Sequence, residues 1–467
     1  MRPRSAIHVA VAALIGWTVA FGQAERVVTT APPSNPADVA GTVRSAAEAG
    51  ELCFRLSTPA EMKTLLGAPT KEQEVQEGGD KAVVLEYPGV QAVFRRFHGK
   101  GMYVLFRVVV EGKPLDIGMD RVTTLRRVDD LARMDTFSGL ANVSLVKLDL
   151  REQLGALGRL HFDTRTQWPS VDRLPKGFDP ARLLEDGKSP GLGVRRLHQQ
   201  GIDGRGVHIA IIDQPLLREH REYKDRVVDY QAIEVDGVPP QMHGAAVASI
   251  AVGRECGTAP AASLHYYAVP TWKWWEEHCK PYAAVLDRIV EDNKELPSAG
   301  KVRVVSISLG AFSGWPDHEL WTKAVRHAAD QGILVLSCDP ADLRVAILKR
   351  NTASDPEVPT SYFRQQLWEP FLGRRDALGV LAGNRTTAYF SGPDDYLFWR
   401  EGGMSWTAPY LAGLAALACQ VNPDIRPQAI PDLWMKSAAK TAGGLVVDPA
   451  AFIEAVQKAA VATKAAT

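Results

Sequence analysis

The sequence is poor in cysteine and carries no excess charge of either sign. Five cysteines among 467 residues are too few for a disulfide scaffold, and no CxxC or Cys/His spacing indicates a zinc site. Cys256 and Cys279 could pair across one loop, although free buried thiols fit the sequence equally well. Lys plus Arg and Asp plus Glu both total 54, so nothing points to nucleic acid or to an acidic membrane surface as a partner.

Long apolar runs are also scarce, and the one present lies at the N-terminus. It covers residues 7–21, follows the basic segment Met1-Arg2-Pro3-Arg4 and precedes the small residues Gly22-Gln23-Ala24. This arrangement predicts a secretory signal peptide over residues 1–24 and export to the periplasm or the extracellular space. An uncleaved membrane anchor is the alternative, but 15 apolar residues are fewer than the roughly 20 that a spanning helix needs.

Three short segments, far apart in the chain, contain candidates for nucleophilic catalysis. In Gly402-Gly403-Met404-Ser405 a serine follows two glycines and precedes a helical run of small residues, which would hold its hydroxyl on a tight turn. The buried-strand pattern of residues 207–212 ends in Asp213, and His243 opens a second helix of small residues. The chain order is therefore Asp, His, Ser.

These residue types fit one chemistry. A serine hydroxyl is a poor nucleophile at neutral pH until a nearby base removes its proton, and His243 is the candidate base. Asp213 would accept a hydrogen bond from the other imidazole nitrogen, which fixes the tautomer and stabilises the imidazolium. The helix that begins at Ser405 would offer backbone N–H groups to a developing oxyanion.

In their order and local context these segments resemble those of the subtilisin-like serine proteases, over about residues 190–460. The resemblance implies an exported serine endopeptidase that hydrolyses polypeptides through an acyl-enzyme, with Asp213, His243 and Ser405 as its catalytic residues. It also implies that Ser308, Leu309 and Gly310 pair with the substrate backbone, and Gly310 would let a peptide approach closely.

The predicted fold class of this region is α/β, a subtilisin-like parallel sheet with helices on both faces. Alternation of strands and helices at these lengths implies right-handed crossovers, with the three catalytic candidates meeting where the strands end. The expected strands lie near residues 207–212, 263–269, 302–309 and 333–337, and the expected helices near 244–252, 282–293 and 319–331.

Several positions depart from the pattern of the family, so the chain resembles a divergent branch. Asp213-Gln214-Pro215 stands where subtilases usually have Asp-Ser-Gly or Asp-Thr-Gly, and Met404 and Trp406 stand where Thr and Met are usual. The triad residues are retained, but their neighbours are bulkier or less polar.

The largest departure concerns the asparagine whose side chain helps to bind the oxyanion in subtilases. The matching segment contains none, and the family position falls on Asp339 or Ala341. An aspartate could serve only if protonated or if it orients a water, and Asn384 would need a rearranged loop. Loss of one such donor costs roughly 10²–10³ in turnover. A slow protease and a pseudoprotease that binds polypeptides without cleaving them therefore both remain open, and an esterase or amidase is a weaker third possibility.

The residues before position 190 lie outside the expected catalytic domain and are predicted to form separate segments. Residues 25–50 are expected to form a flexible linker and residues 51–118 a small α+β module, with a helix near 59–66 and an antiparallel meander over 82–110. By resemblance this module is a possible pro-segment, and a retained accessory domain is the alternative. Residues 119–189 form a connecting region whose leucine-rich-repeat-like stretch near 142–150 is interpreted as core packing, and residues 461–467 form a tail.

Metal binding is not indicated by any motif. Subtilases often bind calcium, but the sequence has no compact Asp/Asn-rich loop of the EF-hand kind. The sequence therefore predicts no required metal or other cofactor.

Overall fold

The chain divides into two compact units, Met1–Phe178 and Asp179–Thr467. The computed structural model describes residues 38–49, 52, 57–77, 80–96, 103–115, 123–125, 127–134, 139–273, 277–311, 314–339, 344–365 and 376–466. The predicted signal peptide, most of the predicted linker and Cys53 lie outside these residues. No helix of the described part is both long and apolar enough to cross a membrane.

The first unit contains the predicted α+β module. Its helix α3 (Pro59–Leu66) begins with a capping box between Thr58 and Glu61 and ends at Gly67, as predicted. Its strands pair in chain order as an antiparallel meander, as predicted, although β1 was not foreseen. Helix α2 (Val39–Glu48) lies within residues 25–50, so the prediction of a flexible linker is wrong for this part, whose Val39, Val43 and Ala46 are buried. The meander comprises β1 (Lys71–Glu77), β2 (Asp80–Tyr87), β3 (Val90–Arg96), β4 (Tyr103–Val110) and β5 (Lys113–Pro114).

The leucine-rich stretch of the first unit forms stacked turns. Strand β6 (Thr123–Thr124) pairs in parallel with β7 (Val143–Ser144), and Ser144 forms a parallel bridge with Gln167. The leucines are buried, which confirms their interpretation as core residues, but they belong to a stack of three rungs rather than to one isolated turn. Short elements around the stack are η2 (Val128–Arg133), α4 (Leu154–Leu157), β8 (Phe162–Asp163) and η3 (Val171–Arg173).

The second unit is built on a parallel sheet of order β10-β11-β9-β12-β13. Each neighbouring pair runs in parallel, so all five carboxyl ends lie at one edge. The predicted fold class is thereby confirmed. The strands are β9 (His208–Asp213), β10 (Val227–Ala232), β11 (Ser263–Ala268), β12 (Val302–Ile307) and β13 (Leu334–Leu336).

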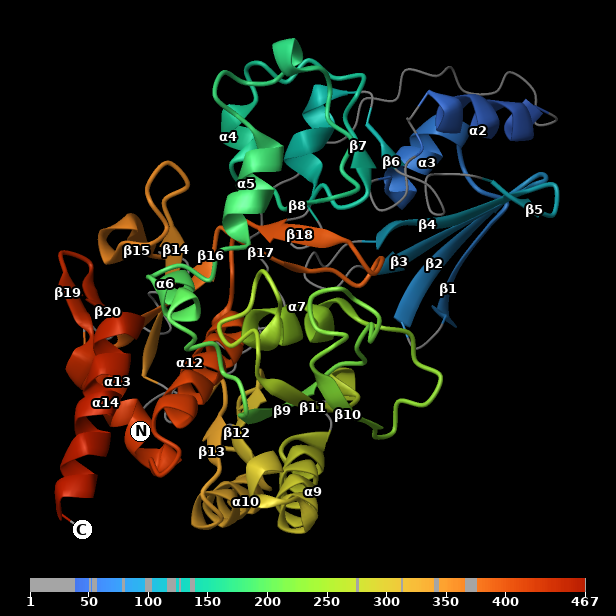
Figure 1. The fold of residues 1–467 in the computed structure, drawn as a ribbon. Helices are drawn as coiled ribbons and strands as arrows, with labels where there is room; N and C mark the ends of the chain where they lie inside the picture. The colour runs from blue at the N-terminus through green and yellow to red at the C-terminus, as the bar shows by residue number, and fades with distance from the viewer. Residues whose placement is uncertain are drawn as a thin grey trace, which may run out of the picture. The chain divides into compact units, whose positions relative to one another are not determined.

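Helices cover both faces of this sheet (Figure 1). Helices α7 (Met242–Val252) and α12 (Thr407–Val421) pack together on one face, and α9 (Lys280–Glu295) and α10 (His318–Asp330) pack together on the other. The first pair consists largely of small residues that are almost all buried, whereas the second pair is amphipathic.

One crossover departs from the expected hand. The connections β10–α7–β11, β11–α9–β12 and β12–α10–β13 all move in the same direction across the sheet. Because α7 lies on the opposite face from α9 and α10, its connection has the opposite hand (Figure 1). Right-handed crossovers account for about 98% of such units, so the prediction that all of them are right-handed is wrong for one connection.

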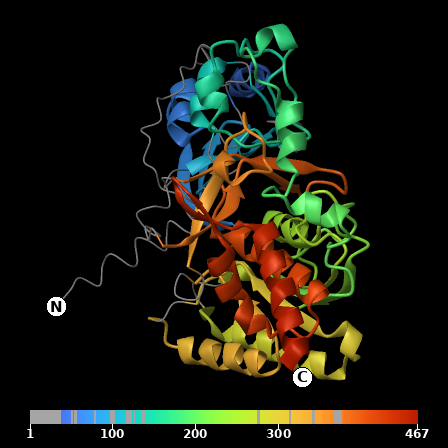
Figure 2. The same cartoon turned by 60° about the vertical axis from the view of Figure 1, so that its left-hand side comes forward.

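A second sheet and a hairpin complete this unit. The sheet has the order β15-β14-β16-β20-β19, and β17 and β18 pair as an antiparallel hairpin. Helices α13 and α14 pack together, and α14 also packs on α12 (Figure 2). These elements, with the remaining short helices, are α5 (Pro180–Gly187), α6 (Val194–Gln199), β14 (Val345–Arg350), β15 (Tyr362–Arg364), β16 (Leu378–Gly383), β17 (Arg385–Ala388), β18 (Tyr396–Trp399), α13 (Ile430–Ser437), β19 (Ala439–Thr441), β20 (Gly444–Val446) and α14 (Pro449–Ala466).

The cysteines of the described part are unpaired. Cys256, Cys279, Cys338 and Cys419 are free and buried. Of the two alternatives open from the sequence, free thiols therefore hold for Cys256 and Cys279.

Candidate active site

The carboxyl edge of the parallel sheet brings Asp213 and His243 together. Asp213 is the last residue of β9, and His243 lies in the first turn of α7. Nδ1 of His243 lies 2.8 Å from Oδ1 of Asp213, which is hydrogen-bonding distance. The Asp213 side chain is fully buried, whereas the His243 side chain is 21% exposed. The histidine can therefore reach a substrate while its carboxylate partner cannot.

Glycine at position 244 allows this approach. A Cβ there would lie 2.5 Å from the carbonyl oxygen of Gln214 and 2.6 Å from the Tyr266 hydroxyl. The Tyr266 hydroxyl donates to that same carbonyl oxygen (2.5 Å), and the Gln214 N–H donates to Oδ1 of Asp213 (2.8 Å). Close contact of the helix start with the turn after β9 thus sets the distance between imidazole and carboxylate.

Neutral groups surround the carboxylate of Asp213. Burial raises the pKa of Tyr266, Tyr282 and Cys338 far above their usual values, and the negative charge of Asp213 raises all three further. These groups are therefore uncharged at neutral pH. Oδ2 of Asp213 is buried and has no hydrogen-bond partner in the described part of the chain. Within the described chain, the carboxylate is therefore hydrogen-bonded only through Oδ1, by the imidazole of His243 and the Gln214 N–H.

Ser405 lies in η7 (Met404–Trp406), directly before α12, and is tied to the end of β12. Its hydroxyl donates to the carbonyl oxygen of Ser308 at 3.3 Å, and the Ser308 hydroxyl donates to the carbonyl oxygen of Ser405 at 2.9 Å. The Cys338 thiol lies beside the Ser405 side chain and forms a hydrogen bond with it. Burial raises the pKa of this thiol, and the hydrogen bond with Ser405 partly opposes that rise. Sequence reasoning did not foresee these contacts.

His243 and Ser405 are neighbours through Trp406. The ring centroids of His243 and Trp406 are 5.2 Å apart, and Trp406 follows Ser405 in the chain. Among the hydrogen bonds of the described residues, none joins the imidazole to the Ser405 hydroxyl. Catalytic hydrogen bonds are often long before a substrate binds, so this arrangement is compatible with a triad at rest.

The predicted substrate segment follows β12 directly. Besides the contacts of Ser308, the carbonyl oxygen of Leu309 accepts a hydrogen bond from the Cys338 N–H at 2.9 Å. Gly310 is buried at the end of this segment. The segment therefore joins the nucleophile to the residues after β13, and its role in substrate binding stays a prediction.

The two oxyanion candidates lie in different surroundings. Asp339 follows β13, is 7% exposed, and its negative charge helps to raise the pKa of Cys338, so it lies near the thiol beside Ser405. Asn384 lies between β16 and β17, and its Nδ2 donates to the carbonyl oxygen of Arg350 at 2.7 Å. Ala341 is outside the described residues. The identity of the oxyanion donor stays a prediction.

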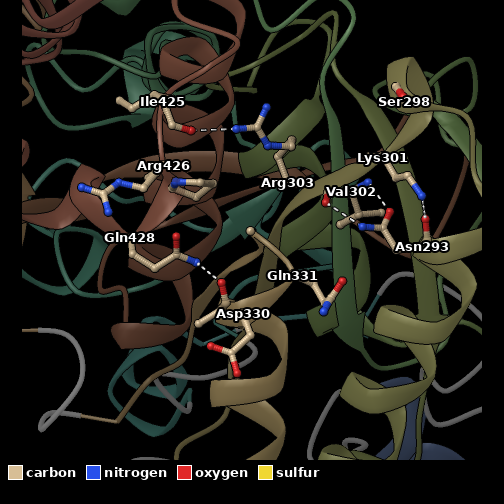
Figure 3. Close-up of a pocket in the computed structure, with 13 residues that line it drawn as sticks. Asn293, Ser298, Lys301, Val302, Arg303, Asp330, Gln331, Ile425, Arg426 and Gln428 are labelled. Carbon is tan, nitrogen blue, oxygen red and sulfur yellow. Dashed lines mark hydrogen bonds between the residues drawn. The ribbon is translucent and has the colours of Figure 1, made fainter. Parts of the chain in front are cut away.

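A pocket of about 510 Å³ opens at the other edge of the sheet (Figure 3). Its polar side chains are used to hold the chain: Arg303 donates to the carbonyl oxygens of Pro423 and Ile425 at 2.9 and 2.8 Å. Gln428 donates to the carbonyl oxygens of Ala329 and Ile333 at 3.2 and 3.1 Å. Because the pocket lies at the amino ends of the strands and Asp213 lies at a carboxyl end, the pocket is separate from the catalytic candidates. No group of three or more His, Cys, Asp or Glu that could hold a metal ion occurs among the described residues.

Comparison with known proteins agrees with this geometry. No protein-family model matches the chain. The chain is 25% identical over 308 residues to the subtilisin-like protease PopC of Myxococcus xanthus, which covers 57% of this chain and 62% of that relative. The resemblance to the subtilisin-like serine proteases is confirmed. The chain thus spans less than two thirds of the length of this relative.

Solved structures similar to this divergent subtilase-like chain were also found. Fervidolysin from Fervidobacterium pennivorans, a keratinolytic enzyme related to subtilisin, is 14% identical over 58% of this chain and 47% of that one, with a TM-score of 0.42. The A-subunit of the AB5 toxin from E. coli is 16% identical over 57% and 98%, with a TM-score of 0.44. The fold assignment stands on the strand order of the parallel sheet.

Proposed function

We propose that this chain is an exported serine endopeptidase that hydrolyses peptide bonds through an acyl-enzyme formed on Ser405. The observation that carries the proposal is the 2.8 Å contact between Asp213 and His243, with the imidazole packed on the residue next to Ser405. Similarity to a subtilisin-like protease supports the same reaction. Export follows from the N-terminal sequence pattern.

In this reaction Nε2 of His243 removes the proton of the Ser405 hydroxyl as its oxygen attacks the scissile carbonyl carbon. The Nδ1–H of the imidazole donates to Asp213, which fixes the tautomer and stabilises the imidazolium. The imidazolium then gives its proton to the leaving amine, and the acyl group stays on the serine oxygen. Water, deprotonated by His243, releases the acid and restores the hydroxyl.

Activation requires the serine hydroxyl to change its hydrogen bond. At rest it donates to the Ser308 carbonyl oxygen at 3.3 Å, at the long end of the hydrogen-bond range. Turning it toward His243 gives up about 1 kcal/mol or less, which a bound substrate can offset. The resting contact therefore slows the reaction little.

Stabilisation of the oxyanion is the weak part of this site. The backbone N–H groups at the start of α12 are one source of donors. Asp339 is the other candidate and would act only when protonated or through an oriented water. We therefore propose a turnover roughly 10²–10³ below that of a site with a dedicated amide donor. The proposed substrate is an extended polypeptide that adds as a strand beside residues 308–310, and no metal takes part.

A fluorophosphonate probe tests the nucleophile, because it reacts covalently with activated serines. The wild-type chain should label, Ser405→Ala should not, and His243→Ala should label far more slowly. Thr407→Ala is a matched control, since its hydroxyl lies two residues away and donates to the Met404 carbonyl oxygen. Labelling of Ser405→Ala at the wild-type rate would show that the nucleophile is assigned wrongly.

A pseudoprotease is the second candidate. It is favoured by the Ser405–Ser308 hydrogen bond and by the use of the Asn384 amide on the Arg350 carbonyl oxygen. It is also favoured because no hydrogen bond of the described residues joins His243 to the Ser405 hydroxyl. Such a protein would bind unfolded polypeptide but release it uncut. Cleavage of an unfolded protein substrate that disappears in His243→Ala would exclude this candidate.

A further inference from the structure

The indole ring of Trp406 packs against the imidazole of His243, the candidate base. The His243 and Trp406 rings are 5.2 Å apart between centroids, with an angle of 37° between their planes. Trp406 is only 4% exposed, and the Trp399 ring packs on it at 5.3 Å. A Cβ on Gly402 would lie 2.7 Å from Cδ1 of Trp406, so the glycine makes room for the indole. The indole is therefore held in one place against the imidazole.

The indole N–H of Trp406 forms no hydrogen bond with the described residues, although its Nε1 is buried. Buried tryptophans usually satisfy this N–H, because leaving it unpaired costs free energy. The position is therefore occupied for the packing of the ring rather than for its hydrogen bond.

The electrostatic surroundings give the ring face a role. Asp213 is the carboxylate bonded to the imidazole, and a second carboxylate, Asp339, lies near the Cys338 thiol beside Ser405. Burial keeps Tyr266, Tyr282 and Cys338 uncharged at neutral pH. A cation within about 6 Å of a tryptophan ring centroid is attracted by the negative ring face. The centroid distance between imidazole and indole falls within this range, so a protonated His243 would be stabilised from two directions.

We propose that Trp406 is a positioning residue, which holds the His243 ring and stabilises its imidazolium form through the face of the indole. The inference rests on the proposed function, in which the imidazolium forms as Ser405 attacks. It assigns a task to one of the departures from the subtilase pattern around the nucleophile.

Titration of the His243 ring by NMR tests this directly. The background is the full chain with Ser405→Ala, so that no hydrolysis is needed, and the His243 signal is the one that His243→Gln removes. Removal of the ring face in Trp406→Leu should lower the titration midpoint by about half a pH unit, a threefold loss of imidazolium stability. A purely structural role would leave the midpoint unchanged or raise it as water enters. Either of these results would overturn the proposal.

Trp434→Leu is a matched control. Trp434 is likewise buried and packs on an aromatic ring, Phe452, at 5.9 Å, and its Nε1 has no hydrogen-bond partner among the residues described. This control should lose stability but keep the His243 midpoint. If Trp406→Leu does not fold, Trp406→Phe keeps a weaker ring face and should show a smaller fall in the midpoint. No fall in that variant would equally overturn the proposal.

Kinetics separates this inference from the proposed function. In the chain with Ser405 intact, Trp406→Leu should lower kcat roughly three- to tenfold with little change in KM, because the imidazolium exists only after binding. A wild-type chain without any hydrolysis would refute the proposed function and leave the NMR result standing. A normal rate with an unchanged midpoint in Trp406→Leu would refute only the role of Trp406.

Discussion

The two ends of the central parallel strands use their polar groups in opposite ways. At the amino ends, Asn293 pairs through its side chain with both backbone groups of Val302, and Arg303 donates to two carbonyl oxygens. At the carboxyl ends, Oδ2 of Asp213 and Nε1 of Trp406 are buried without a partner in the described structure. The side chains of Asn293 and Arg303 are thus paired at one end, whereas Asp213 and Trp406 each have an unpaired polar atom at the other.

This difference indicates that the amino ends of the strands serve mainly stability and the carboxyl ends serve mainly activity. Unpaired buried groups lower stability and are expected mainly at functional sites, because rigid surroundings must hold them in place. The rigidity here comes from α7 and α12, whose small residues are buried on all sides. Substitutions at the carboxyl ends should therefore change activity first, and those at the amino ends should change stability first.

The largest effect is expected from Asp213→Asn. An amide at this position can favour the wrong imidazole tautomer, so kcat should fall by about 10⁴ while the fold is retained. Hydrolysis of an unfolded protein substrate and thermal unfolding measure the two effects side by side. A variant with normal kcat would contradict the role of Asp213, and a loss of folding would contradict the proposed separation of the two ends.

The opposite behaviour is expected from Arg303→Met. This change keeps the alkyl packing but removes the donors to the Pro423 and Ile425 carbonyl oxygens. The free energy of unfolding should fall by about 1–3 kcal/mol, as urea titration would measure, with kcat unchanged for the folded fraction. Lys323→Met on the exposed side of α10 is the control and should change neither quantity, because surface ion pairs such as that of Lys323 with Glu319 contribute little. A large fall in kcat for Arg303→Met would contradict the comparison.

The parts of the site that local sequence patterns determine could be predicted from the sequence. Asp213 ends a strand of apolar residues and His243 opens a helix, so their elements could be predicted, and the order of the strands then brings them to one edge. The pairing of the two side chains at 2.8 Å agrees with that expectation.

The rest depends on contacts between distant segments that no local pattern encodes. The hydrogen bonds between Ser308 and Ser405 join residues 97 positions apart, and the packing of Trp406 against His243 depends on the closeness of two helix starts. The opposite hand of the α7 crossover was missed because the general rule favours the other hand. A bulky residue beside the nucleophile was visible in the sequence, but its partner was not.

Two histidines at the amino ends, half-buried His208 and buried His265, should make stability depend on pH. Nδ1 of His208 lies 2.9 Å from Nε2 of His265, and burial lowers the pKa of both rings. For His265, the nearby His208 also lowers the pKa, and Asp229 partly opposes this. Below pH about 6.5 the unfolded chain binds protons that the folded chain does not, so stability is fully present above this pH and falls as the pH drops.

The variant His265→Phe keeps a ring at this position but cannot titrate. The free energy of unfolding should depend less steeply on pH between about 5 and 6.5. The slope should fall by at most about 1.4 kcal/mol per pH unit for each proton that the chain no longer takes up on unfolding. Half-buried His198 and buried His220, whose pKa values are also lowered by burial, will keep part of the slope. An unchanged slope in His265→Phe would contradict a role for the pair.

The smallest effect is expected from Ser308→Ala, which touches the carboxyl end without removing a reacting group. The variant loses the hydrogen bond from the Ser308 hydroxyl to the Ser405 carbonyl oxygen but keeps the Ser308 carbonyl oxygen that the serine hydroxyl contacts at rest. One such bond contributes about 1 kcal/mol, so kcat should change less than tenfold. Ser306→Ala is the control, since its buried hydroxyl has no partner in the described chain and its loss should leave kcat unaltered. A fall in kcat as large as that of Asp213→Asn would mean that Ser308 acts on the reacting atoms themselves rather than through the backbone of Ser405.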